Sequence, residues 1–204
     1  MKRKKDEIMQ NLPFNTLDSW ALWDEPAGDI SQLDDETRQN QFGEAYQPNH
    51  FPKEQLPADL ASALSEVKFV LVGLNPGSAG VTLDEQQEFL NFHGQKKSLD
   101  YRLAAAVYGT PLWGAFMTDL VAIDESNSEN VVSGEAEVQA LEDHLDQLGI
   151  PAEAVLVGLG TKAATTLRQF AQRPVEKLPH YSGANGHWKA ANTRQAVLKI
   201  AEKY

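Results

Sequence analysis

The stretch FVLVGLNPGSAG, residues 69–80, combines a core strand with a polar turn. Its first six residues are mostly apolar, and a short apolar run that ends at a turn signal predicts a buried strand. The run ends at Asn75, Pro76 and Gly77, which are residue types typical of turns. Asn75 therefore has two interpretations: it closes a turn, or it forms the wall of a pocket that handles a base or nucleotide.

Strands and helices alternate along the chain after this first strand, which we place at 68–74. Further apolar runs predict strands at 115–122, 154–160 and 175–180. The spacing of apolar residues predicts helices at 84–92, 98–108, 135–148, 161–172 and 187–204. Short apolar strands separated by helices are typical of parallel sheets covered on both faces. We therefore predict an α/β fold with three α/β/α layers around a central four-stranded, mostly parallel sheet.

The first third of the chain differs in composition from the rest. Residues 1–66 are rich in acidic and amide side chains, are punctuated by prolines, and carry scattered aromatic residues. We expect them to form an irregular extension whose aromatic side chains pack on the main domain of residues 67–204. Short helices are predicted within the extension, near 31–41 and 57–67.

The composition excludes several classes of function. The chain has 204 residues and no cysteine, which excludes disulfides, zinc–thiolate sites and cysteine-held iron–sulfur clusters. No apolar run approaches the roughly 20 residues of a membrane span, so no membrane partner is expected. The basic N-terminal residues precede no apolar stretch, so no secretory signal is expected and a cytoplasmic location is predicted.

The charge distribution leaves two possibilities open. The net charge of −11 argues against a general nucleic-acid binder, because DNA affinity comes largely from lysine and arginine. Residues 160–204 nevertheless carry eight lysines and arginines against two glutamates. This segment presents either a locally positive face to a partner or ordinary solvated helix surfaces.

Polar or glycine-rich residues follow each predicted strand. Ligands of open α/β sheets bind beyond the carboxyl ends of the strands, so these positions are candidates for function. They are Asn75-Pro76-Gly77, Thr118-Asp119, the segment 158–161, and His180-Tyr181-Ser182.

Two of these strand ends resemble paired motifs of the uracil-DNA glycosylase superfamily. GLNPG at 73–77 resembles the first active-site motif of its mismatch-specific and single-strand-selective branches. HYSGAN at 180–185 resembles the second motif, with Tyr181 where the family has proline. Between them, FMTDL and VLVGLGTKAATTL resemble the strand that ends in a base-reading asparagine and the penultimate strand with its glycine turn. The resemblance spans about 67–204 and implies a monofunctional base-excision enzyme that acts on DNA without a metal or other cofactor.

The resemblance implies a role for each matched residue. Asn75 would orient the attacking water, and His180 would stabilise the negative charge on the expelled base. An amide positions water but cannot take its proton, so slow hydrolysis is expected. Matched residues of the two motifs would line the base pocket: Gly73, Pro76, Gly77, Tyr181 and Ser182. Residues of the second loop, Gly183 and Asn185, would contact DNA.

Residues between the motifs each have a functional and a structural interpretation. Phe92 either stacks on the base, which is worth about 1–3 kcal/mol, or packs in the core. Lys96 and Lys97 either contact phosphate or are solvated. His93 is expected at the surface.

Asp119 departs from the family pattern, which has asparagine there. An ionised carboxylate only accepts hydrogen bonds, so it would repel a uracil carbonyl. Either Asp119 is protonated, or it points elsewhere, or the preferred base carries an amino group. Because of this departure and of Tyr181, a catalytically silent module that binds a nucleobase or nucleotide stays open as the alternative. A plain interaction domain that uses the Trp-rich extension is a third possibility.

Overall fold

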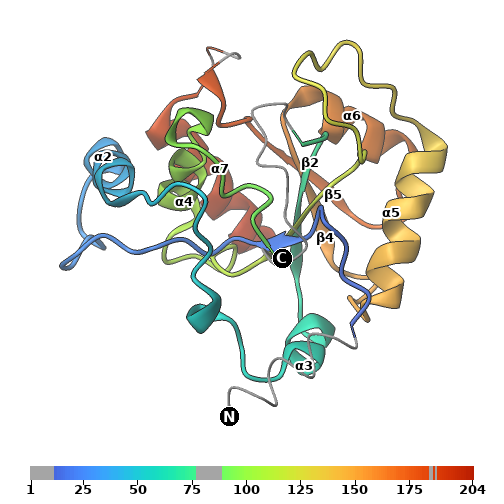
Figure 1. The fold of residues 1–204 in the computed structure, drawn as a ribbon, viewed down its shortest axis with the longest axis horizontal. Helices are drawn as coiled ribbons and strands as arrows, with labels where there is room; N and C mark the ends of the chain where they lie inside the picture. Colours follow the sequence, from blue (N-terminus) through green and yellow to red (C-terminus); the bar gives the residue numbers. More distant parts are fainter. Residues whose placement is uncertain (1–11, 77–88, 184–185, 187) are drawn as a thin grey trace.

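A computed structural model describes residues 12–76, 89–183, 186 and 188–204 of the chain. Within these residues five strands form one sheet in the order β1-β3-β2-β4-β5 (Figure 1). β1 runs antiparallel to β3, and every other neighbouring pair is parallel. The strands are β1 (Ser19–Trp20), β2 (Phe69–Gly73), β3 (Phe116–Asp119), β4 (Val155–Leu159) and β5 (Val175–Leu178).

Helices cover both faces of this sheet, which confirms the predicted three-layer α/β/α arrangement (Figure 1). α5 and α6 lie on one face with α3 at its lower end, while α4 and α7 lie on the other with α2 packed against them. The helices are α2 (Asp35–Ala45), α3 (Leu60–Ser65), α4 (Tyr101–Val107), α5 (Glu135–Gln147), α6 (Thr161–Phe170) and α7 (Ala190–Lys203). Two 3-10 turns, Lys53–Gln55 and Lys96–Ser98, complete the described elements.

Alternate residues of the central strand supply the two halves of the core. Val70 and Val72 of β2 pack in the cluster on the α5 and α6 side. Phe69 and Leu71 pack in the cluster on the α4 and α7 side. All residues of β2 are buried, as expected for a parallel strand covered on both faces.

The sheet has one strand more than the sequence predicts. The additional strand, β1, comes from the predicted extension and pairs at the edge, with Ser19 beside Met117 and Trp20 beside Phe116. Two residues are too few for an alternating pattern, so this strand leaves no periodic signal in the sequence. Trp20, like Trp23 farther along the same segment, is almost completely buried.

Two helix predictions differ from the structure at their starts. Residues 84–88 lie outside the described residues, and 89–92 form turns instead of helix. The helix predicted from 98 begins at Tyr101. A 3-10 turn precedes it, and Leu99 takes the left-handed conformation with φ of 65°, which a helix cannot include. Within the described residues no helix is both long and apolar enough to cross a membrane.

Candidate active site

The parallel strands end together at one edge of the sheet, here called the carboxyl edge. Gly73 pairs with Asp119, and the last residues of β4 and β5, Leu159 and Leu178, pair with each other. Beyond Gly73 the backbone still pairs with the chain after β3, because Leu120 N donates to Gly73 O over 3.0 Å. The polar residues that follow β2, β3 and β5 therefore gather at this edge, as the sequence predicts for parallel strands.

Gly73, Phe92 and Asp119 meet at the carboxyl edge. A methyl group built on Gly73 would collide with the Asp119 carboxylate and lie 3.0 Å from Cε1 of Phe92. A glycine at position 73 is therefore required by this close approach. Phe92 is half-buried and holds φ at 69°, a conformation that is rare for a bulky residue and that occurs often at functional sites.

Asn91, which none of the sequence motifs includes, is the direct partner of Asp119. Its Nδ2 donates to Asp119 Oδ2 over 2.9 Å and to Leu17 O over 2.7 Å. Asp119 is 4% exposed, and its burial raises the pKa of its carboxyl to about 7 although the bond from Asn91 lowers it. Burial therefore favours the protonated form of Asp119 more than that of an exposed aspartate. The only sequence signal for Asn91 is its place beside Phe92.

His180 is held as a neutral imidazole. Part of its surface meets solvent, but the protein packed around its ring lowers the pKa to about 4. Its Nδ1 accepts a hydrogen bond from Ser182 N over 3.1 Å, and this bond assigns the remaining proton to Nε2. The ring stacks on that of Tyr181 with a centroid distance of 4.5 Å. His180 can therefore donate a hydrogen bond from Nε2 at neutral pH.

The loop that carries His180 is anchored to neighbouring elements. A methyl group on Gly160, which has φ of 92°, would lie 3.3 Å from Cβ of His180, so the loop passes close to the end of β4. Arg102 of α4 donates from Nη1 to Tyr181 O over 3.1 Å. A methyl group on Gly183 would lie 3.4 Å from Cδ1 of Leu99. The loop thus reaches from β4 to the turn that bears the two predicted DNA-contacting lysines.

Asn75 anchors a second loop to the end of β2. Its Nδ2 lies 2.8 Å from each of three carbonyl oxygens, those of Pro76, Ile123 and Glu125. The two N–H groups of the amide are therefore used, whereas Oδ1 has no partner among the described residues. Asn75 is therefore a structural tie between the end of β2 and this loop.

The loop at 123–131, whose backbone Asn75 binds, is acidic and is also bound by Lys162. Its carboxylates at Asp124, Glu125 and Glu129 form what we term the acidic rim. Lys162 of α6 donates to Ser128 O over 2.5 Å and to the carbonyl of Val131 over 2.6 Å. The backbone next to Asn75 is therefore fixed, and it carries negative charge.

The remaining predicted site residues lie around this arrangement. Lys96 and Lys97 are exposed, and Pro76 is half-buried next to Asn75. Ser182 takes part through its backbone N–H. The predictions for Gly77 and Asn185 concern positions outside the described residues. Tyr181 is 7% exposed, so it packs under His180 instead of projecting toward solvent.

Two buried groups behind the site have structural partners. His93 is fully buried, which shows that its predicted surface position is wrong; Trp23 and Phe51 pack around its ring, and burial lowers its pKa to about 3. Asp100 accepts hydrogen bonds from Trp23 Nε1 over 2.9 Å and from the Tyr46 hydroxyl over 2.8 Å. Burial raises the pKa of the Asp100 carboxyl to about 7.

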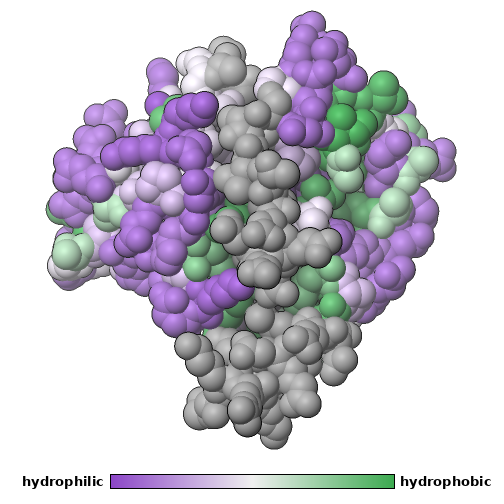
Figure 2. Space-filling view, viewed as in Figure 1, coloured by the Kyte–Doolittle hydropathy of each residue, from purple (hydrophilic) through white to green (hydrophobic). Residues whose placement is uncertain are grey.

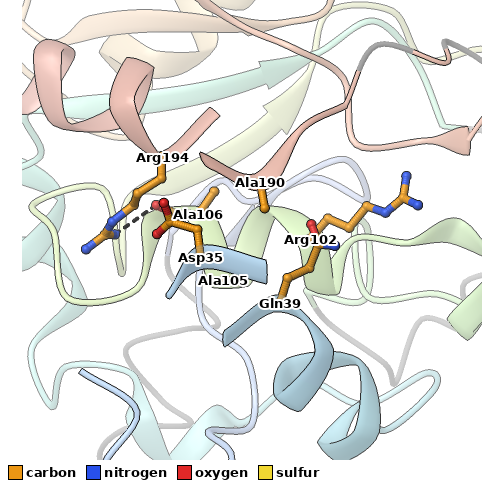
Figure 3. Close-up of a pocket in the computed structure, with 7 residues that line it drawn as sticks. All are labelled: Asp35, Gln39, Arg102, Ala105, Ala106, Ala190 and Arg194. Atoms are coloured by element: carbon orange, nitrogen blue, oxygen red, sulfur yellow. Dashed lines mark hydrogen bonds between the residues drawn. The ribbon is translucent and has the colours of Figure 1, made fainter. Parts of the chain in front are cut away.

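The polar side chains that line a depression elsewhere on the molecule are paired within the protein. It lies between α2, α4 and α7, encloses about 160 Å³ of space open to solvent, and is lined by Asp35, Gln39, Arg102, Ala105, Ala106, Ala190 and Arg194 (Figure 3). Arg194 is used there by a carbonyl of α4, since its Nη1 donates to Ala106 O over 2.9 Å. We therefore place the candidate site at the carboxyl edge.

Neither the surface nor the comparisons with known proteins identify a ligand for this site. Hydrophilic residues dominate the surface over α2 and much of that over α5 in Figure 2. In the part of the chain that the structure describes, no group of three or more metal-ligating side chains could hold a metal ion.

No protein-family model matches the chain, and no curated protein is significantly similar to it.

Proposed function

We propose that this chain is a monofunctional DNA glycosylase of the uracil-DNA glycosylase type, which hydrolyses the N-glycosidic bond of a deaminated or damaged base flipped out of DNA. Such an enzyme must hold the extruded base, stabilise the departing anion and seat a water molecule. The observation that carries the proposal is the neutral His180, with its proton on Nε2, at the same sheet edge as Asn75 and Asp119.

The base would lie against Gly73, Phe92 and Asp119. The half-buried ring of Phe92, which lies beside Gly73, offers the base a stacking surface worth about 1–3 kcal/mol. The carboxyl of Asp119 would meet the hydrogen-bonding edge of the base. Burial of this carboxyl supports recognition, because a hydrogen bond away from water discriminates strongly between donors and acceptors.

His180 would donate from Nε2 to the oxygen on which charge develops as the base leaves. A neutral donor that is already oriented costs no reorganisation during the reaction. The bond from Ser182 N and the stacked Tyr181 ring hold the imidazole in place. This arrangement stabilises an anionic leaving group without a proton from solvent.

Asn75 would accept a hydrogen bond from the attacking water through Oδ1, since its Nδ2 is used by backbone carbonyls. No carboxylate is required if the sugar becomes strongly cationic before water adds. Because the Asn75 amide cannot take a proton from the water, we expect slow turnover.

The DNA strand would contact Lys96, Lys97 and the loop at Gly183. These two exposed lysines lie in the turn that ends at Leu99, against which Gly183 packs. Because the chain carries a net charge of −11, the affinity for DNA should be modest and strongly dependent on salt. A cytoplasmic location belongs to this proposal.

A base-release assay tests the proposal. Purified protein is incubated with single- and double-stranded oligonucleotides that carry uracil, hypoxanthine or xanthine, and abasic sites are measured by strand cleavage in alkali. The wild-type chain should release at least one of these bases. Asn75→Ala and His180→Ala should lose release, while Asn40→Ala on the exposed face of α2 serves as the matched control. No release from any substrate by folded wild-type protein would overturn the proposal.

The acidic rim favours a second candidate, a module that binds a nucleobase or nucleotide without cleaving it. The three carboxylates of the acidic rim, in the loop whose backbone Asn75 binds, would repel the phosphates of a DNA duplex. Calorimetric titration with uracil, hypoxanthine and their nucleosides distinguishes the two functions. Tight binding of a free base together with an absence of release from DNA would support the binding module.

A further inference from the structure

A single peptide group, the one between Tyr181 and Ser182, joins two of the contacts around His180. Its carbonyl oxygen, Tyr181 O, accepts a hydrogen bond from Arg102 Nη1 over 3.1 Å. Its N–H, that of Ser182, donates to His180 Nδ1 over 3.1 Å. The group is planar and trans, so its C=O and N–H point in opposite directions. Arg102 and the imidazole of His180 are therefore bonded to the two ends of one rigid unit.

The guanidinium of Arg102 is committed to this peptide group. Arg102 lies in the first turn of α4 and is half-buried. Within the described residues its side chain makes one hydrogen bond, the one to Tyr181 O, and forms no ion pair with a carboxylate. Its Nε is buried without a partner among those residues. The bond to Tyr181 O is therefore the polar contact that orients the Arg102 side chain.

A charged donor at the carbonyl strengthens the N–H at the other end of the peptide group. A hydrogen bond from an ionised donor is roughly twice as strong as one between neutral groups, and hydrogen bonds in series polarise one another. Arg102 thus makes Ser182 N–H a better donor and keeps it pointing at Nδ1 of His180. Because Nδ1 accepts this bond, the proton of the neutral imidazole stays on Nε2.

The other contacts of His180 do not distinguish between its two ring nitrogens. The ring of Tyr181 stacks on the imidazole, and a methyl group on Gly160 would lie 3.3 Å from Cβ of His180. Both contacts restrict where the ring lies. Neither donates or accepts a hydrogen bond at a nitrogen, so the choice of the protonated nitrogen is left to the peptide group that Arg102 binds.

We propose that Arg102 is a positioning residue, which acts through the peptide group between Tyr181 and Ser182 and determines which ring nitrogen of His180 carries the proton. The importance of Arg102 for base release rests on the proposed function, in which Nε2–H donates to the departing base. The tautomer of His180 is measurable whether or not the chain is an enzyme.

The first experiment records the imidazole nitrogen signals by NMR near neutral pH. In the wild-type chain the two nitrogens of His180 should give widely separated signals, with the proton on Nε2. In Arg102→Met the peptide group is free to turn, so both tautomers should be populated and the two signals should move toward each other. Arg102→Lys retains a charged donor and should restore part of the separation. Wild-type signals in folded Arg102→Met would overturn the inference.

Arg194→Met is the matched control. Arg194 also donates from Nη1 to backbone carbonyls, those of Ala106 and Tyr108, and it lines the same depression as Arg102. The two guanidinium groups point in opposite directions from this depression (Figure 3). Arg194→Met should therefore keep the wild-type signals of His180. Equal changes in Arg102→Met and Arg194→Met would mean that the tautomer responds to any loss of an arginine tie, which contradicts the inference.

A milder variant keeps the inference testable if Arg102→Met does not fold. Arg102→Gln retains an N–H donor without the charge, so the signals of His180 should still approach each other, by a smaller amount. Unchanged signals in Arg102→Gln would then overturn the inference. A mixture of tautomers in the wild-type chain would overturn it without any variant.

Base release connects the tautomer to activity. Single-turnover release at saturating protein should fall by about tenfold or more in Arg102→Met, because the Nε2–H donor is no longer held in place. Arg102→Lys should recover part of the loss, and Arg194→Met should stay within about threefold of wild type. A loss of release without a change of tautomer would overturn the inference and leave the glycosylase proposal intact. If the wild-type chain releases no base, the proposed function fails, while the NMR result still decides the role of Arg102.

Discussion

The backbone N–H of Ser182 donates a hydrogen bond to Nδ1 of His180 over 3.1 Å. One short contact within a loop therefore sets the tautomer of the imidazole and leaves Nε2–H as its donor. The ring of Tyr181 stacks on the imidazole. Burial lowers the pKa of His180 to about 4, so the imidazole is neutral at neutral pH. The role proposed for His180 rests on this geometry more than on its place in a motif.

The first prediction concerns the donor role of His180. His180→Phe retains an aromatic ring for stacking on Tyr181 but has no N–H, so uracil release should fall by about 10²–10³, the usual effect of removing one donor to a developing anion. The measurement is single-turnover base release. Because the histidine titrates near pH 4, the wild-type rate should show no histidine step between about pH 6 and 8. A step there, absent in His180→Phe, would contradict the neutral assignment.

The second prediction separates the two roles of Asn75. Asn75→Ala removes the tie to the carbonyls of Ile123 and Glu125 as well as the acceptor for water. We expect a loss of about 1–3 kcal/mol in the free energy of unfolding and a fall of about a hundredfold in base release. Lys162→Met is the matched control, because it unties the same loop at Ser128 without touching the site.

Chemical denaturation and base release are measured on both variants. Lys162→Met should lose a similar stability and keep release within about threefold of wild type, in line with a purely structural tie. Equal losses of release in the two variants would mean that Asn75 acts only by holding the loop.

The third prediction concerns the buried carboxyl of Asp100. Its pKa in the folded chain is about 7 against an ordinary value of 3.8, so the folded state binds more protons than the unfolded state between these pH values. The free energy of unfolding should therefore fall as the pH rises from about 4 to 7, by up to about 4 kcal/mol from this group. Asp119 contributes a fall of the same sign.

Urea denaturation at several pH values tests this for the wild-type chain, Asp100→Asn and the exposed control Asp124→Asn. The fall with pH should be smaller in Asp100→Asn and unchanged in Asp124→Asn. An equal change of stability with pH in the wild-type chain and in Asp100→Asn would show that Asp100 is ionised in the folded chain.

The fourth prediction concerns the contact between β4 and α6. A methyl group on Gly158 would lie 2.6 Å from Cα of Ala164, a backbone atom that cannot move alone. Gly158→Ala should lower the free energy of unfolding by at least about 2 kcal/mol, because the helix must shift away from the sheet. Gly94→Ala is the control: its methyl group would meet only Ser98 Oγ at 3.4 Å. Thermal denaturation of both variants measures the difference.

The sequence predicts the strands and helices that surround the site, because their apolar residues recur with regular spacing. β2 is a run of apolar residues covered on both faces, and its parallel neighbours bring Asp119 to the same edge. Asn75 and His180 each stand two residues after the end of a strand, so their placement follows from the strand ends. The three-layer fold follows from the same alternation of strands and helices.

Other features depend on tertiary contacts that leave no periodic trace. Asn91 is an ordinary amide in a turn, and its bond to Asp119 spans 28 positions of the chain. His93 looks like a surface residue, yet Trp20 O accepts from its Nε2 over 3.2 Å inside the core. The raised pKa of Asp119 comes from burial, which no short motif encodes. Strand β1 has only 2 residues, too few for an alternating apolar pattern that would predict it from the sequence.

The last prediction addresses how an acidic chain would hold DNA. Lys96 and Lys97 are exposed next to Leu99, which packs against Gly183, so these lysines lie beside the loop that carries His180. Replacing both with alanine should weaken binding to a single-stranded oligonucleotide. It should also reduce the dependence of log affinity on log salt by about 0.7 for each phosphate that a lysine no longer neutralises.

Two other exposed lysines supply the control, Lys68 just before β2 and Lys199 in the second half of α7. Both stand toward the opposite end of the sheet, because Lys68 precedes β2 and because Lys203, at the end of α7, pairs with Glu176 near the start of β5. The double variant Lys68→Ala and Lys199→Ala changes net charge by the same amount and should leave the salt slope unchanged. If the two double variants bind DNA equally weakly, the affinity depends only on the net charge of the chain. In that case the turn at Lys96 and Lys97 is not a contact surface.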